Sequence, residues 1–480
     1  MSRVSSPMCG VLALACAAVT LSACIDLAPH YQRPALPTPG AFPVGGAYPA
    51  ASADVQQVTG WRDFFADPRL KTVIGEALAN NRDLRVALAN VAAARGQYVV
   101  QRAALFPKLN ATASATYGQT PTSVIDGGAV AAGAPGTYNE RLYSLGAGFS
   151  AWQLDLFGKV RDSTRAALET YFANREARDA AQVTLIGEVA SDWLTLGSDR
   201  ALLAIAESTR KSGEATVSLT RSRFSSGVAS DLDVAQAETV AQQARYDVAR
   251  LTTQVAQDRN ALELVVGAPV GDDLLPPDID NDGVVLSRLP AGLPATVLLT
   301  RPDVVQAEDQ LKAANANVGA ARAAFFPDIS LTGSGGVTSL ALSTLFRGAA
   351  ETWSFAPTVS QPIFDFGANR GNLTQARAQR TAAVATYEKA IQTAFREVSD
   401  ALAQRGTIDE QLAAQAALTG ASQRAYRLSE ARYERGADTY LNALVAERTF
   451  YAAQQTLTQT RLARATNLVT LYTALGGGLD

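Results

Sequence analysis

The sequence has few of the side chains that bind soft metals or shuttle protons. It contains one His, three Cys and two Met in 480 residues. Both Met residues and two of the Cys lie within the first sixteen positions, and the single histidine is His30. One imidazole cannot build a multi-histidine metal site, and a Ser-His-Asp triad would have to rely on it. We therefore expect no multi-histidine or soft-metal site and no enzyme that works through histidine.

An excess of either charge is also missing. The chain has 42 Lys plus Arg against 45 Asp plus Glu, for a net charge of -3. This balance gives no electrostatic reason to expect binding to nucleic acid. The length suggests two or three domains with ample material for a buried core. An alanine-rich, charge-balanced composition favours long helices.

The N-terminal residues have the pattern of an export signal. Arg3 is the only charged residue before Asp26, and a short apolar run separates the two. About thirteen apolar residues are too few to span a bilayer as a helix, which takes about 20. The run ends in Leu-Ser-Ala-Cys, which matches the lipobox of bacterial lipoproteins. We predict a signal peptide at 1–23, lipidation of Cys24 and a lipidated extended segment at 24–60; an ordinary signal peptide with an incidental cysteine is the alternative.

The residues after Cys24 bear on the destination. Ile25 follows the cysteine, whereas an aspartate there would resemble a signal for retention in the inner membrane. Two or more acyl chains anchor a protein stably. We therefore expect a protein that is lipid-anchored in the cell outer membrane. Residues 29–49 are rich in Pro and Gly, so we interpret His30 as a solvated residue of a tether.

The chain repeats itself once. Phe-Pro at 106–107 recurs at 326–327, an offset of 220, and Phe-Gly at 157–158 recurs at 366–367, an offset of 209. A loop between the two pairs would absorb the difference. The predicted segments are repeat 1 at 61–267, a linker at 268–290, repeat 2 at 291–476 and a tail at 477–480.

Each repeat contains two short segments in which apolar and polar residues alternate. The segments are 108–117 and 143–151 in one hairpin (108–155), and 329–338 and 353–360 in the other (328–364). Strands of about ten residues with one apolar face are typical of a transmembrane β-barrel, although a soluble sheet on a core alternates in the same way. Four strands cannot close, and open edges are not tolerated in hydrocarbon. Three copies would supply twelve strands and leave room for water inside.

Helical patterns fill the rest of each repeat. A first helix ends at each Phe-Pro step, which cannot continue a helix. After each hairpin we predict two long helices, at 159–211 and 230–266, then at 368–418 and 437–475. One of them carries a heptad-like seam of mostly small residues: Ala237, Ala241, Ala244, Val248, Leu251 and Val255. Such a seam alone indicates structural packing; together with the strands it indicates the wall of a tube.

Several motifs, taken in order, resemble a known family. They are Arg223-Phe224 to Gly227, Gly292-Leu293-Pro294, Arg301-Pro302-Asp303, Arg432-Tyr433 to Gly436, and Ala474-Leu475-Gly476. In this order and spacing, the sequence resembles the outer-membrane efflux factors of tripartite pumps, the TolC/OprM type, and specifically their NodT-like lipoprotein branch. The resemblance covers essentially all of the chain after the signal.

The resemblance implies a fold that is mainly α with a β-barrel part. Long α-helical hairpins and four transmembrane β-strands per protomer, in two structural repeats, would form a trimeric α/β-barrel. It implies passive conduction of small molecules such as drugs and toxic compounds, without a cofactor or a metal. It also implies an equatorial belt of short elements near the linker, residues 268–290. It also implies a homotrimer whose partners are a periplasmic adaptor, an inner-membrane proton-driven transporter and outer-membrane lipid.

The resemblance also implies roles for residues at the two turns between long helices. The candidates for adaptor docking are Arg223, Phe224, Gly227, Arg432, Tyr433 and Gly436. The candidates for a periplasmic gate are Asp233, Tyr433 and Asn442. Plain helix caps would explain both glycines without a partner, and Tyr433 could be a packed aromatic. Asn442 and Val445 occupy positions where the family can have acids, which argues against a gate closed by carboxylates.

Two other functions are compatible with parts of the sequence. A scaffold or adhesin lipoprotein could use the same helical hairpins without transport. A glycoside hydrolase would need two acids that face one cleft, but the acids here are scattered over helical surfaces.

Overall fold

The computed structural model describes residues 26–49, 60–121, 137–279, 294–347 and 350–478. The predicted signal peptide and the predicted lipidation site, Cys24, lie outside the described residues. The same is true of residues 280–290 of the predicted linker.

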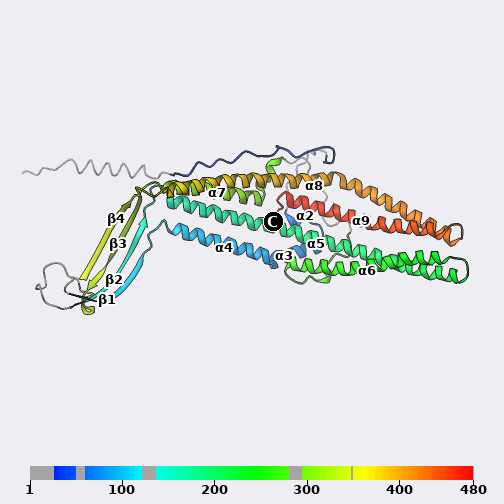
Figure 1. Cartoon of the computed structure of the whole chain (residues 1–480), viewed down its shortest axis with the longest axis horizontal. Coiled ribbons are helices and arrows are strands. Elements are labelled where there is room, and N and C mark those ends of the chain that lie inside the picture. The colour runs from blue at the N-terminus through cyan, green and yellow to red at the C-terminus, as the bar shows by residue number, and fades with distance from the viewer. Residues whose placement is uncertain (1–25, 50–59, 122–136, 280–293, 348–349, 479–480) are drawn as a thin grey trace, which may run out of the picture. The chain divides into compact units, whose positions relative to one another are not determined.

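The described chain forms two compact units. Unit 1 contains the described parts of 1–33, 92–172 and 309–385, and unit 2 those of 34–91, 173–308 and 386–480. Each unit therefore draws on both halves of the sequence. The order of elements is the same in the two halves: a helix, two strands and two long helices (Figure 1). The shorter helices are α2 (Trp61–Phe64), α3 (Pro68–Asn80), α4 (Arg82–Ala103) and α7 (Pro302–Ala323), with 3-10 turns η2 (Asp272–Leu274), η3 (Ala295–Thr300) and η4 (Leu342–Thr344).

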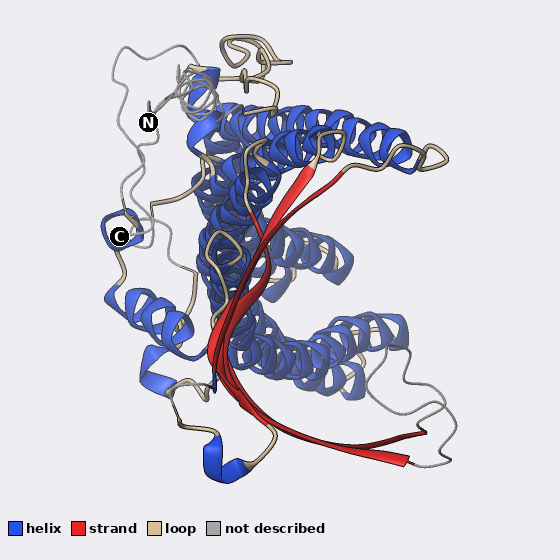
Figure 2. Ribbon diagram, turned by 90° about the vertical axis from the view of Figure 1, so that its left-hand side faces the viewer, coloured by secondary structure: helices blue, strands red, loops and turns tan. Residues whose placement is uncertain are grey.

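Unit 1 contains an antiparallel sheet with the strand order β1-β2-β3-β4, which Figure 2 shows as curved. The strands are β1 (Asn110–Pro121), β2 (Thr137–Gln153), β3 (Asp328–Ser339) and β4 (Glu351–Ser360). The register places Ala113 opposite Leu145 and Leu145 opposite Val337, so apolar residues continue across one face. The outer strands, β1 and β4, each have one side without a partner strand among the described residues. The four predicted strands are confirmed.

Strand β2 is longer than the apolar alternation predicted. The alternation began at Tyr143, but the strand begins at Thr137. The added residues are mostly polar, and the backbone ladder continues through them: Asn139 lies opposite Gln119, and Arg141 lies opposite Tyr117. Backbone pairing therefore extends this strand beyond the segment that side-chain polarity marks.

The long helices are α5 (Lys159–Ser225), α6 (Asp231–Val266), α8 (Ala368–Glu434) and α9 (Tyr440–Ala474). The predicted ends of α5 at 211 and of α8 at 418 were wrong, because both helices continue to the next turn. Gly213 does not break α5; an added Cβ would lie 3.2 Å from the Ala241 Cα, so this glycine permits close packing on α6. Thr419 of α8 is buried and donates to the Ala453 carbonyl of α9.

The hydrophobic core of unit 2 forms where α2 and α3 pack with α5, α6 and α9. Phe64 stacks on Tyr472 with ring centroids 4.4 Å apart, and the Trp193 indole donates to the Leu274 carbonyl. A buried Arg301 pairs with Asp303 at 2.8 Å and with Glu397 at 2.9 Å. It also donates to the carbonyl of Ala474, and so ties the start of α7 to α8 and to the end of α9.

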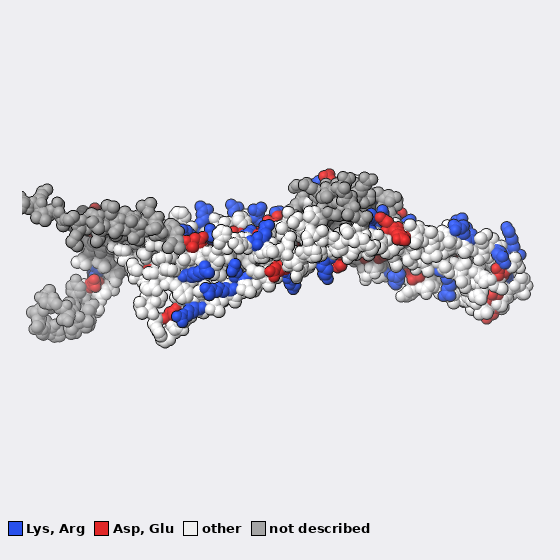
Figure 3. Space-filling view, turned by 90° about the horizontal axis from the view of Figure 1, so that it is seen from above, with Lys and Arg blue, Asp and Glu red and all other residues white. Residues whose placement is uncertain are grey.

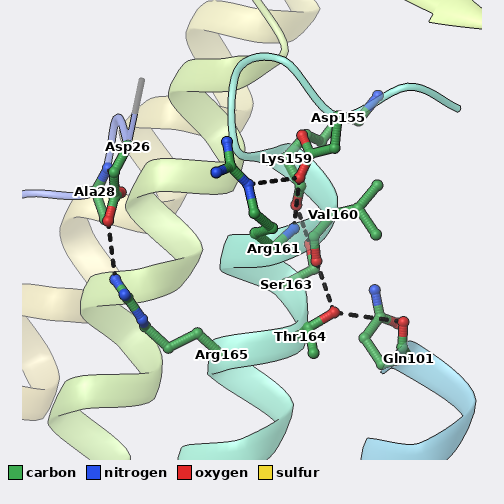
Figure 4. A network of polar contacts seen from close by, with 10 residues as sticks. All are labelled: Asp26, Ala28, Gln101, Asp155, Lys159, Val160, Arg161, Ser163, Thr164 and Arg165. Atoms are coloured by element: carbon green, nitrogen blue, oxygen red, sulfur yellow. Dashed lines mark hydrogen bonds and ion pairs between the residues drawn. The ribbon is translucent and has the colours of Figure 1, made fainter. Parts of the chain in front are cut away.

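The described N-terminal residues of unit 1 pack on α5 and α7. Asp26 pairs with Arg165 of α5 at 3.0 Å, as Figure 4 shows. From α7, the Arg322 guanidinium donates to the Leu27 carbonyl and the Asn315 amide to the Pro29 carbonyl. This stretch, residues 26–31, is named the N-terminal strap below. His30 within it is exposed.

The surface carries mixed charge. On the face shown in Figure 3, basic and acidic side chains of the described residues are interspersed along the molecule, in keeping with the near-zero net charge. Within the described ranges, each helix falls short of the length or apolarity that a membrane crossing requires.

Candidate functional site

Two turns of unit 2 have the same backbone geometry. In the first turn, between α5 and α6, Gly227 has φ 76°, and the Val228 N–H donates to the Arg223 carbonyl. In the second turn, between α8 and α9, Gly436 has φ 71°, and the N–H of residue 437 donates to the Arg432 carbonyl. This is the left-handed helix end for which glycine is favoured. No atom lies within 4 Å of a Cβ added at either glycine, so both have open space beside them.

The side chain of Arg223 joins the first turn to the second. Its guanidinium carbon lies 4.6 Å from the centre of the Tyr433 ring, and its Nη2 donates to the Glu434 carbonyl at 3.2 Å. These two candidates, selected from different turns, therefore contact each other within one protomer. Such cation–π contacts stabilise by about 0.5–1 kcal/mol where solvent reaches them.

A small apolar cluster lies behind the turns and joins the two helical hairpins. It consists of Ala237 and Val240 of α6 with Tyr440 and Leu444 of α9, and Tyr433 packs against it. We call these four buried residues the turn cluster. The hydroxyl groups of Tyr433 and Tyr440 are both buried and lack a hydrogen-bond partner among the described residues. Tyr433 is thus a packed aromatic with an unused donor.

The candidate gate residues engage local partners. Asp233 closes a capping box at the start of α6, where its Oδ2 accepts from the Ser230 N–H at 2.9 Å. Asn442 donates to the Asp438 carboxylate, which also pairs with Arg432 at 3.1 Å. Among the interactions found in the described residues, none joins Asp233 to the Tyr433 hydroxyl.

Asp438 was missed by the sequence reasoning, although it connects Arg432 with Asn442. Hydrogen bonds from Asn442 and from the Thr439 N–H, together with Arg432, hold the pKa of this carboxyl below its usual value. The sequence does carry a signal for Asp438. It is an acid two residues after the turn glycine and one residue before the helix N-cap, and acids stabilise helix N-termini.

Apolar side chains are exposed around the turns. Phe224 and Val228 lie at the first turn, and Leu441 and Val445 follow the second; each is exposed by about half or more. Exposed apolar residues that group on one surface favour a protein partner. Of the six docking candidates, Phe224 is one of these exposed apolar residues, whereas Tyr433 is half-buried.

Comparisons with known proteins identify the family. The family model described as "Outer membrane efflux protein" matches residues 73–268 and 293–477. The chain belongs to this family. It is an outer-membrane channel component of an efflux pump, and the family is one of channels rather than enzymes. The pump assignment implies pump partners.

The relatives match over nearly their whole length. The toluene efflux pump outer membrane protein TtgC of Pseudomonas putida is 46% identical over 470 residues, which are 98% of this chain and 95% of the relative. The cation efflux system protein CusC of Escherichia coli is 39% identical over 463 residues, 96% of this chain and 97% of the relative.

Solved structures agree with the fold. The open state of the Neisseria gonorrhoeae MtrE outer membrane channel has a TM-score of 0.83 and 37% identity, and the match covers 95% of this chain and 99% of that chain. A structure of CusC has a TM-score of 0.82 and 39% identity, with 94% and 100% covered. The expected fold, long helical hairpins with four strands in a TolC-like channel, is confirmed.

Proposed function

We propose that three copies of this chain close a twelve-stranded barrel in the outer membrane and a helical tube below it. The observation that carries the trimer is the open sheet of unit 1: β1 and β4 are its outer strands, and every residue of β4 is exposed in the single chain. Open edges are not stable in lipid. The halves 61–267 and 291–476 would act as two structural repeats, with residues 268–290 as an equatorial linker between them.

Exposed apolar side chains support the same assembly. Trp353 is 84% exposed on β4, with Phe355 and Val359 on the same strand, as suits a lipid-facing surface. In α4, Leu84 is the one buried residue, whereas Val99 and Val100 are exposed. A neighbouring copy would cover such a helix.

The two turns would form the periplasmic end of the tube. There the exposed apolar residues and turn glycines would receive a periplasmic adaptor, which connects the channel to a proton-driven transporter of the inner membrane. The docking residues proposed are Arg223, Phe224, Gly227, Arg432, Tyr433 and Gly436. The proposed gate comprises Tyr433 with Asp233 and Asn442. The lipid would be attached at Cys24.

We propose small organic molecules as cargo. Relatives at 42–46% identity are named for toluene, solvent or antibiotic efflux, and CusC is named for cations. Beyond Cys24 the sequence contains no Cys or Met and one His. Soft metal ions prefer those ligands, so the chain itself favours organic cargo over metal ions.

Purified full-length protein tests the channel and the trimer together. Light scattering after size-exclusion chromatography is expected to give three times the protomer mass, and planar bilayers containing the protein are expected to conduct ions. A monomer without conductance would contradict the proposal. Mass spectrometry of the mature N-terminus tests lipidation, which Cys24→Ser should abolish.

A further inference from the structure

Glu447 is a buried acid at a junction of four long helices. It is the single acid among the 35 residues of α9 and is 7% exposed. It lines a cavity of about 410 Å³ whose walls come from α5, α6 and α9. No hydrogen bond or ion pair from a described residue satisfies its carboxyl group. A buried polar group without a partner is costly, so this carboxyl calls for a physical explanation.

Charged groups surround Glu447 without neutralising it. Glu430 of α8 faces Glu447. The Oε1 of Glu430 accepts a hydrogen bond from the Tyr426 hydroxyl at 2.9 Å. From α6, Asp247 and Arg250 line the cavity, and Asp247 is already occupied by the Tyr451 hydroxyl at 3.0 Å.

The other two helices add little charge. The cation Arg448 of α9 lines the cavity, and α5 contributes Leu202 and Thr209, which carry no charge. The charge that acts on Glu447 most strongly is therefore the like charge of Glu430.

Burial has the largest effect on the pKa of Glu447, and the like charge of Glu430 has the next largest. Together they raise this pKa to about 7. Both causes oppose the charged form. The neutral acid suits the packed junction around Glu447, and the carboxylate favours any arrangement that brings it more water. The balance between the two arrangements therefore shifts across neutral pH.

The position of Glu447 couples it to the turn cluster. Tyr440 and Leu444 precede it by seven and three residues, so all three share one face of α9. Tyr440 and Leu444 make the apolar contact with Ala237 and Val240 of α6 that joins the two hairpins. Water that enters beside Glu447 would therefore weaken the adjoining contact between the hairpins.

We propose that Glu447 is a proton-operated lock between the α5–α6 and α8–α9 hairpins. When neutral, it keeps the junction closed; when ionised, it hydrates the cavity and loosens α9 toward the second turn. This proposal rests on the proposed channel function, with the turns at its closing end. The closed junction is favoured at acidic pH and is lost as the pH rises through 7, because ionisation is easier in the hydrated arrangement.

The test uses purified full-length trimer in planar bilayers between pH 5 and pH 8.5. The ratio of open to closed channels in the parent protein should rise with pH, about tenfold for each pKa unit that opening relieves. Glu447→Gln cannot ionise and should stay in the closed-like distribution at every pH. Glu430→Gln should retain the transition but move it to lower pH, because it removes the like charge.

Two further measurements keep the result unambiguous. Glu410 is an exposed acid on α8, so Glu410→Gln should behave like the parent. Hydrogen exchange of residues 440–451, corrected for intrinsic rates, should quicken with pH in the parent but not in Glu447→Gln. Conductance without pH dependence in the parent, or an unchanged pH dependence in Glu447→Gln, overturns the lock. Absence of conductance at every pH instead overturns the channel function.

Discussion

The guanidinium of Arg223 lies over the ring of Tyr433, 4.6 Å from its centre, although 210 positions separate the two in the sequence. The contact ties the first turn to the second within one protomer. It also uses the face of an aromatic ring whose hydroxyl has no hydrogen-bond partner among the described residues. Each turn is therefore held by its neighbour as well as by its own backbone.

Arg223→Ala should loosen the two turns. Loss of the cation–π contact, about 0.5–1 kcal/mol, predicts a two- to fivefold rise in the open-to-closed ratio per protomer, measured by conductance. Arg221→Ala is the matched control: this arginine lies one half-turn earlier in α5 and pairs with Glu238 instead. Equal effects of the two substitutions would show that charge, rather than the ring contact, matters.

The turn glycines should resist substitution because of their backbone angles. Gly227→Ala and Gly436→Ala place a Cβ at φ 76° and 71°, which costs about 1–2 kcal/mol per residue. We expect weaker binding to an adaptor in a pull-down assay and faster hydrogen exchange at the turns. Gly420→Ala, within helix α8, has no such strain and is the control. Unaltered exchange at Gly227→Ala would contradict the assigned geometry.

Gly319 of α7 is expected to be essential for seating the N-terminal strap. A Cβ there would lie 2.7 Å from the Ala28 Cα and would also clash with the Asp162 carboxyl. Gly319→Ala should therefore expose residues 26–31 to proteases, with little change in helix content by circular dichroism. Gly371→Ala, also in unit 1, has open space and should leave the strap protected.

Asp162 predicts a pH effect on unit 1. Burial, and then the charge of Asp26, raise the pKa of this carboxyl to about 6. A folded-state pKa above the unfolded value means that folding is favoured at low pH, and that stability falls as pH rises through 6. Asp162→Asn should therefore stabilise the protein by about 1–3 kcal/mol at pH 8 and by little at pH 4. Thermal unfolding at the two pH values measures this, and a gain of equal size at both would refute it.

Much of the fold was predictable because the periodicities are regular. Alternation identified all four strands, and the Phe-Pro steps marked where α4 and α7 end. The ends of α5 and α8 were not predictable from local signals, because Gly213 and Gly420 look like helix breakers until their helical surroundings are known. The start of β2 was missed because backbone pairing, rather than polarity, extends it.

The candidate site was predictable only in part. Motifs located both turns and their glycines, since positive φ leaves a sequence signal. The pairing of Arg223 with Tyr433 was not visible, because contacts between distant helices depend on how the hairpins pack. Glu447 belongs to no sequence motif. Its proposed role depends on its burial and on the charge of Glu430, which lies on a different helix.

The N-terminal strap has a consequence for the order of folding. The Asn315 amide that holds the Pro29 carbonyl lies 286 residues later in the chain, and Arg322 lies 295 residues after Leu27. Contacts of such separation form late, since a long loop must close first. The strap residues, although they stand near the start of the chain, are thus among the last to settle, and they are fixed in place only once α7 has formed.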